Sequence, residues 1–163
     1  MATMEEYAAQ TVDRRLDRLK RTADQLEGAI RGHVAEALAR RPDGKNWAGV
    51  EVICHLRDTE EAFLGRFEII LAVNEPPVAV SNPDRWAEER QYLRSDAGHG
   101  IAAFRTRRTD SLEFLRVLTP AQWRRAGIHP VRGPMTIDTF LTVMAWHDDN
   151  HLDQLQRALA GKP

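Results

Sequence analysis

The sequence contains a single cysteine, Cys54, among its 163 residues. One thiol excludes an intrachain disulfide and is typical of proteins in a reducing compartment. The amino terminus turns acidic at once and lacks the apolar core of a secretory signal. Uninterrupted apolar runs near the roughly 18 residues that span a bilayer are missing as well. We therefore expect a cytoplasmic protein with no membrane partner.

Net charge is also scarce, because 23 basic residues oppose 24 acidic residues and leave a formal charge of −1. Such a balance provides no large electrostatic field to attract nucleic acid or an anionic membrane. We therefore expect no nucleic-acid partner. Two basic pairs, Arg14-Arg15 and Arg107-Arg108, stand among acidic residues and are interpreted as solvated helix faces.

Regular two-residue alternation of apolar and polar residues is missing too, which favours an all-α fold over one built on sheets. Proline and glycine interrupt the chain at residues 40–46, 74–84 and 129–134, and these segments are predicted to be connections. Between them, apolar residues recur at three- and four-residue steps. This periodicity predicts long helices over 12–40, 48–73, 96–118 and 136–159, and short helices within 81–93 and 119–123.

Four amphipathic helices in a chain of this length bury their apolar stripes against one another. The sequence therefore predicts one domain, residues 1–163, folded as an all-α four-helix bundle. The connection after the second long helix is long enough for a crossover, so a simple up-down order is not required.

Near the carboxyl end, the segment MAWHDDNHLDQL places His147 and His151 four residues apart. At about 100° per residue, both fall on the apolar stripe of the last helix, with Phe140, Met144 and Leu155. One buried histidine is more often structural than functional. Two histidines at positions i and i+4 can instead bind one cation, as in helical zinc sites. The pair therefore predicts part of a metal site.

A third imidazole has to come from upstream, where four histidines are candidates. His99 lies between two glycines and is expected to be exposed. His129 lies in the loop before the last helix, from which it could reach the mouth of the site. His33 and His55 each flank the apolar stripe of their own helix, and periodicity alone does not separate them.

Two segments carry a family resemblance. The first contains Trp47, Glu51, His55-Leu56, Asp58, Glu60, Phe63 and Arg66, and the second reads His147-Asp148-x-x-His151-x-x-Gln154. Together they resemble the DinB/YfiT-like superfamily, over about residues 12–160. The resemblance implies a four-helix bundle, often dimeric, in which His55, His147 and His151 bind a divalent metal. Ala48 departs from the pattern, because relatives often carry a capping Ser or Thr there.

Three neutral imidazoles leave at least one coordination position open, as in catalytic metal sites. The expected ion is divalent, with zinc or nickel ahead of iron or manganese, since imidazole suits several of these metals. Asp58, Asp148 and Gln154 are polar candidates to orient the rings, although both aspartates are expected to be solvated. Cys54 points about 100° away from His55 around its helix and is interpreted as a small core residue.

For function, the resemblance implies a metal-dependent hydrolase or a thiol-dependent S-transferase acting on a small molecule, with a low-molecular-weight thiol as a candidate partner. No catalytic residue is assigned. The alternative is a non-enzymatic, stress-related protein in which the metal only joins the second long helix to the fourth.

Ile69, Leu71 and Val73 lie away from the main stripe of their helix, and Val78–Val80 adds apolar surface nearby. A symmetric homodimer would bury such a patch, and the resemblance also implies dimers. The alternative is that the crossover connection folds back over these residues. We expect a homodimer.

Overall fold

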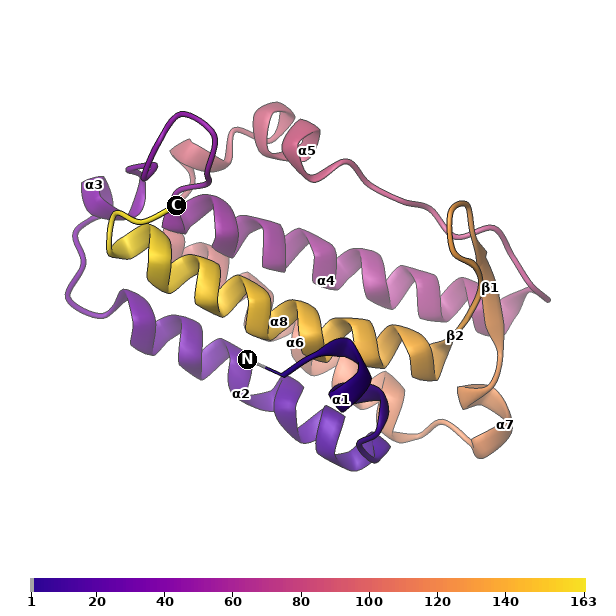
Figure 1. Cartoon of the computed structure of the whole chain (residues 1–163). Helices are drawn as coiled ribbons and strands as arrows, with labels where there is room; N and C mark the ends of the chain where they lie inside the picture. Colours follow the sequence, from indigo (N-terminus) through magenta and orange to yellow (C-terminus); the bar gives the residue numbers. More distant parts are fainter. Residues whose placement is uncertain (1) are drawn as a thin grey trace.

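The computed structural model describes residues 2–163 and shows four long helices packed side by side (Figure 1). The predicted four-helix bundle is therefore confirmed. The long helices are α2 (Val12–Ile30), α4 (Gly49–Ala72), α6 (Ala97–Arg116) and α8 (Ile137–Leu159). The shorter elements are α1 (Met4–Ala8), α3 (Ala35–Leu38), α5 (Pro83–Glu89), the 3-10 helix η1 (Tyr92–Arg94), α7 (Pro120–Trp123), β1 (Ala126–His129) and β2 (Gly133–Thr136).

The connection between α4 and α6 gives the bundle its topology. Residues 73–96, which include α5, return along α4 to the end of the bundle where α4 begins (Figure 1). As a result α4 and α6 run in the same direction, and α2 and α8 run opposite to them. Helix α4 packs against both α6 and α8, and α2 packs against both as well. The predicted crossover is present, and it places α4 directly beside α8.

Polar side chains fix where the long helices begin. The hydroxyl of Thr11 accepts from the N–H of Arg14 at the start of α2, and Thr136 caps α8 in the same way. Helix α4 begins differently, because Ala48 has no polar side chain. The carboxylate of Glu51 instead accepts the N–H of Ala48 (2.9 Å), and Arg41 donates two hydrogen bonds to that carboxylate.

The first predicted helix, over residues 12–40, is wrong in its second part. Helix α2 ends at Ile30, and Gly32 has a φ of +84°, a left-handed conformation that ends a helix. Only the single turn of α3 follows. Val34 continues the apolar spacing of α2 but is 64% exposed. The predicted helix is too long because the apolar spacing continues beyond the glycine that ends the helix.

The third predicted connection, residues 129–134, belongs to a β-hairpin that the sequence pattern did not show. Strands β1 and β2 have only four residues each and pair antiparallel, with His129 opposite Gly133. The N–H of Ile128 donates to the carbonyl of Pro76, and the N–H of Val78 donates to the carbonyl of Ile128. The hairpin thereby holds the start of the crossover connection against the end of α4.

The apolar stripe predicted for the last helix is buried, including Phe140, Met144 and Leu155. The crossover covers part of the apolar patch near the end of α4, since Val78 is buried, while Ile69 and Val80 stay 40% and 53% exposed. Across residues 2–163, no helix has the length and apolar character needed to cross a membrane.

Candidate metal centre

Helices α4 and α8 bring three histidines from distant parts of the chain together. His55 lies near the middle of α4, and His147 and His151 lie one turn apart on α8. One ring nitrogen from each residue lies within 4.8 Å of the other two. The Nε2 atoms of His55 and His147 are 3.1 Å apart. The three residues singled out from the sequence therefore form one cluster.

The spacing of this cluster fits one divalent cation. Two imidazole nitrogens bound to a tetrahedral zinc ion at about 2.0–2.1 Å are separated by about 3.3 Å. The 3.1 Å between His55 and His147 is close to that value. The ring centroids of His147 and His151 are 4.2 Å apart, and those of His55 and His151 are 4.5 Å apart. Three nitrogens that face one another this closely can share a cation.

Electrostatics favour the neutral form of each ring. Burial, followed by the nearby His151, lowers the pKa of His55 to about 3, against a smaller opposing effect of Asp58. Burial, followed by the two neighbouring histidines, lowers the pKa of His147 well below its usual value. The pKa of His151 is lowered by burial too. Only neutral imidazole can donate a lone pair to a metal, so at neutral pH all three are ready to bind.

Polar side chains next to the cluster hold two of the three rings in place. Gln154 lies one turn beyond His151, and its Oε1 is 2.7 Å from Nδ1 of that ring. An amide oxygen only accepts, so Nδ1 carries the proton and Nε2 is left for the cation. The hydroxyl of Thr59 lies 3.4 Å from Nδ1 of His55. The sequence had indicated Gln154 for this role, but not Thr59.

Aromatic side chains form two walls of the site. The ring of Trp47 stacks on His151, with centroids 6.5 Å apart and an angle of 14° between the planes, and lies 5.0 Å from His55. The indole N–H of Trp47 donates to Asp84 on α5, which ties this wall to the crossover connection. On the other side, Phe63 meets His147 edge-on at 6.1 Å. These rings limit the access of water to the cluster.

The prediction that Asp58 and Asp148 are solvated is wrong. Asp148 is 1% exposed and accepts hydrogen bonds from Arg108 and Thr22. Asp58 is 4% exposed and accepts from four donors. These donors are Arg57, Arg90, Tyr92 and Arg107.

Burial alone would raise the pKa of Asp58, but the hydrogen bonds from Arg57, Arg90 and Tyr92 hold it below its usual value. Asp58 is therefore a charged group inside the protein. Arg15 and Arg108 were likewise expected on solvated faces and are 3% exposed. Sequence spacing missed these buried charges because most of their partners lie on other elements.

The other histidines stay outside the cluster. His33 is exposed and the side chain of His99 is 94% exposed, as expected for His99. The ring of His129 accepts from the N–H groups of Val131 and Arg132 in the hairpin turn. Cys54 is fully buried, in agreement with its interpretation as a core residue, and burial raises its pKa. A buried neutral thiol is a poor nucleophile.

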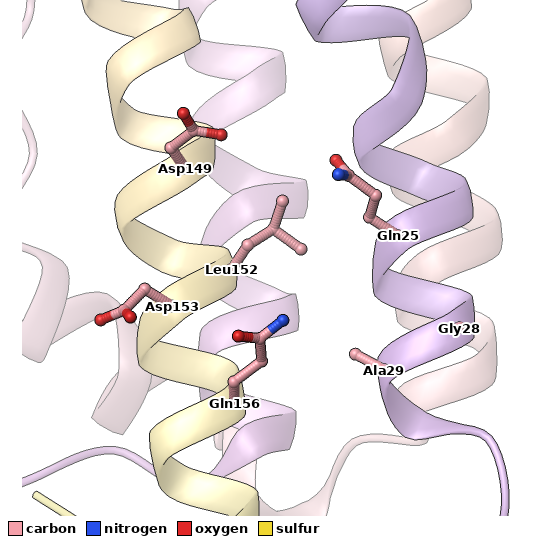
Figure 2. A pocket seen from close by; sticks show the side chains of 7 residues that line it. All are labelled: Gln25, Gly28, Ala29, Asp149, Leu152, Asp153 and Gln156. Carbon is pink, nitrogen blue, oxygen red and sulfur yellow. The ribbon is translucent and has the colours of Figure 1, made fainter. Parts of the chain in front are cut away.

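A separate hollow of the molecule lies away from this cluster. Figure 2 shows it between α2 and α8, where Gln25 and Ala29 face Leu152 and Gln156. Its volume is about 570 Å³. None of the three clustered histidines lines it, so this hollow is separate from the candidate metal centre.

Comparisons with known proteins agree with the fold. The sequence model of the DinB superfamily matches residues 7–155. "Putative metal-dependent hydrolase YfiT" of Bacillus subtilis is 24% identical over 107 residues, which are 65% of this chain and 60% of that protein. "Putative metal-dependent hydrolase OB0782" of Oceanobacillus iheyensis is 28% identical over 107 residues, which are 65% of this chain and 61% of that protein. The chain thus matches less than two thirds of the length of these relatives.

The solved structure of YfiT from Bacillus subtilis, described as having an unusual four-helix bundle topology, superposes with a TM-score of 0.85. The superposition covers 100% of this chain and 92% of YfiT, at 20% sequence identity. At that identity the likeness shows the fold.

Proposed function

Because the chain belongs to the DinB superfamily, we propose that it is a metal-dependent enzyme that acts on a small molecule, as a hydrolase or a thiol-dependent S-transferase. One observation carries this proposal: three neutral imidazoles from α4 and α8 converge on one point. The names of two relatives describe metal-dependent hydrolases, which supports the hydrolase part.

In this proposal His55, His147 and His151 hold one divalent ion, with zinc or nickel ahead of iron or manganese. When bound, the ion supplies a Lewis acid that lowers the pKa of a water molecule or a thiol. Gln154 keeps the Nε2 atom of His151 directed at the ion. Trp47 and Phe63 exclude water from two sides of the cluster.

A second candidate is a non-enzymatic protein in which the ion only joins α4 to α8. The observation that favours it is the position of the cluster between two helices that already pack along their length. Three protein ligands argue for the enzyme, since structural zinc sites almost always have four.

Metal content tests the site itself. We expect about one divalent ion per chain in the purified protein, measured by elemental analysis. His55→Ala, His147→Ala and His151→Ala should each lower this content sharply, because each removes one of three ligands. His99→Ala is the matched control, since its exposed ring lies outside the cluster. Full metal content in all three variants would rule out the assignment.

Activity separates the enzyme from the structural alternative. Ester and amide hydrolysis and thiol S-transfer to electrophiles should be assayed with the metal-loaded protein, the chelator-treated protein and the His147→Ala variant. An activity that needs both the metal and His147 supports the enzyme. Absence of metal-dependent turnover, together with a large loss of thermal stability on chelation, supports the structural alternative.

A further inference from the structure

Arg66 on α4 carries a charge that the protein leaves without a partner. Its side chain is partly buried, and its Nε donates to the carbonyl of Ala79 (3.0 Å). Among residues 2–163, no carboxylate lies within ion-pair distance of it, and its two terminal nitrogens make no hydrogen bond to the chain and remain accessible to solvent. The buried arginines, Arg15, Arg18 and Arg108, each have a carboxylate partner. Arg66 therefore differs from these three arginines, and its charge is free to pair with a group from outside the chain.

The surroundings of Arg66 hold its guanidinium in position. It lies over the ring of Phe63, 5.1 Å from the centroid, and 6.0 Å from the centroid of Phe140. Burial removes the Arg66 guanidinium from part of its water and thereby lowers its pKa. Removing an unpaired charge from water costs free energy. An anion that pairs with the terminal nitrogens would recover part of that cost.

Arg66 borders a groove of about 350 Å³ between α4 and the crossover connection. Its volume falls in the range of small-molecule sites. The lining is mainly apolar and includes Gly65, Ile69, Pro77, Val80 and Trp86 beside Arg66. The groove thus combines an apolar body with one charged group.

The groove lies on the same face of α4 as His55. Ala62 and Arg66 follow His55 by seven and eleven residues, which is close to two and three turns of the helix. They therefore lie on the same face of α4 as His55. Both line the groove. Side chains on a helix lean toward its amino terminus, so the Arg66 guanidinium extends back toward His55. Phe63, which lies under that guanidinium, also contacts the ring of His147.

We propose that this groove binds a small organic carboxylate, with its carboxylate on Arg66 and its apolar body along Ile69, Val80 and Trp86. One unpaired positive charge matches a monoanion, and a guanidinium pairs with a carboxylate through two parallel hydrogen bonds. The groove would then select the substrate class of the candidate enzyme, and in this respect the inference rests on the proposed function.

Binding can be tested without any turnover. Isothermal titration with hexanoate and with hexan-1-ol, a neutral molecule with the same chain, should be carried out on chelator-treated protein. We expect one hexanoate per chain, bound at least tenfold more tightly than hexan-1-ol. Arg66→Gln should reduce hexanoate affinity tenfold or more, to the level of the alcohol. Arg66→Lys, which keeps the charge without the forked geometry, should fall between them.

Arg85→Gln is the matched control, because Arg85 lies on α5 near the groove, is largely exposed and pairs with Glu89. It should bind hexanoate like the unmodified protein. Equal affinities for hexanoate and hexan-1-ol in the unmodified protein would overturn the proposal, even if Arg66→Gln failed to fold. So would unchanged binding in a folded Arg66→Gln variant.

A second copy of the chain is the competing occupant. Hexanoate affinity that weakens as protein concentration rises, while the molecular mass doubles, would show that a second copy fills the groove and would overturn the proposal. The His147→Ala variant separates this inference from the proposed function. It should lose metal and still bind hexanoate, so each idea can fail while the other holds.

Discussion

Arg108 lies inside the bundle between two carboxylates from different helices. It reaches Asp148 on α8 at 2.6 Å and Glu60 on α4 at 2.7 Å, and it donates to the carbonyl of Leu19 on α2. All three charged side chains are less than 5% exposed. A buried charge has to be paired, because isolating it from water is costly. This cluster therefore joins the four long helices in one arrangement, directly behind His147.

Removing one member of this cluster should be strongly destabilising. We expect Asp148→Asn, which keeps the shape of the side chain, to lower the free energy of unfolding by about 3 kcal/mol, because a buried arginine loses a charged partner. Urea unfolding of chelator-treated protein measures this without a contribution from metal.

Asp153→Asn is the control, since Asp153 lies on the same helix and pairs with Arg157 in solvent. Exposed pairs contribute about 1 kcal/mol or less. Equal effects of the two substitutions would show that the buried cluster contributes no more than a surface pair.

At the scale of elements, the hairpin and the end of α4 are fitted closely together. Gly127 on β1 has no room for a larger side chain, since an added Cβ would lie 2.5 Å from Val78 and 2.9 Å from Ile70. Both of these residues are buried. The contact holds the first part of the crossover connection, which forms one wall of the groove beside Arg66.

Gly127→Ala should therefore push the hairpin away from α4. We expect a loss of about 1–3 kcal/mol in the free energy of unfolding, the usual cost of overpacking a core. Limited proteolysis should also cut residues 74–82 faster, because the hairpin holds this segment.

Gly28→Ala on α2 is the matched control, because a Cβ added there would have no neighbouring atom within 4 Å. Alanine in a helix interior is favoured over glycine by about 1 kcal/mol, so this variant should be slightly more stable. If Gly127→Ala proved as stable as Gly28→Ala, the fit between hairpin and helix would not be tight.

For the whole molecule, the order of the helices decides what lies next to the site. The crossover sends α6 in the same direction as α4, and α8 then enters the bundle between α2 and α4 (Figure 1). The same crossover buries Val78 but leaves Ile69, Val73 and Val80 largely exposed at one end of the molecule. The alternative in which the crossover folds back over this patch is therefore realised in part, and the homodimer stays a prediction.

Light scattering coupled to size exclusion measures the assembly. We expect twice the chain mass at micromolar concentration, because a two-fold contact through Val73, which lies outside the groove beside Arg66, would bury exposed apolar surface. Val73→Glu should return the mass to that of one chain. Val117→Glu is the control, since Val117 is also an exposed apolar residue but lies at the end of α6. A single-chain mass for the unmodified protein at all concentrations would exclude the dimer.

The sequence by itself determined the features that depend on local spacing. Periodicity placed α4, α6 and α8 within two residues of their observed ends, and it placed His147 and His151 on one face of α8. It overextended the first helix because apolar spacing does not register the left-handed turn at Gly32. His55 came from a resemblance, since spacing alone did not distinguish it from His33.

Only the tertiary structure decided which distant residues meet. It brought His55 within hydrogen-bond distance of His147, 92 residues away, and it buried Asp148 against Arg108, 40 residues away. It also paired two four-residue strands and left Arg66 unpaired at a groove. The physical reason is common to all of these. Helix formation follows from neighbouring residues, whereas the pairing of buried charges and of ligands depends on how separate helices pack.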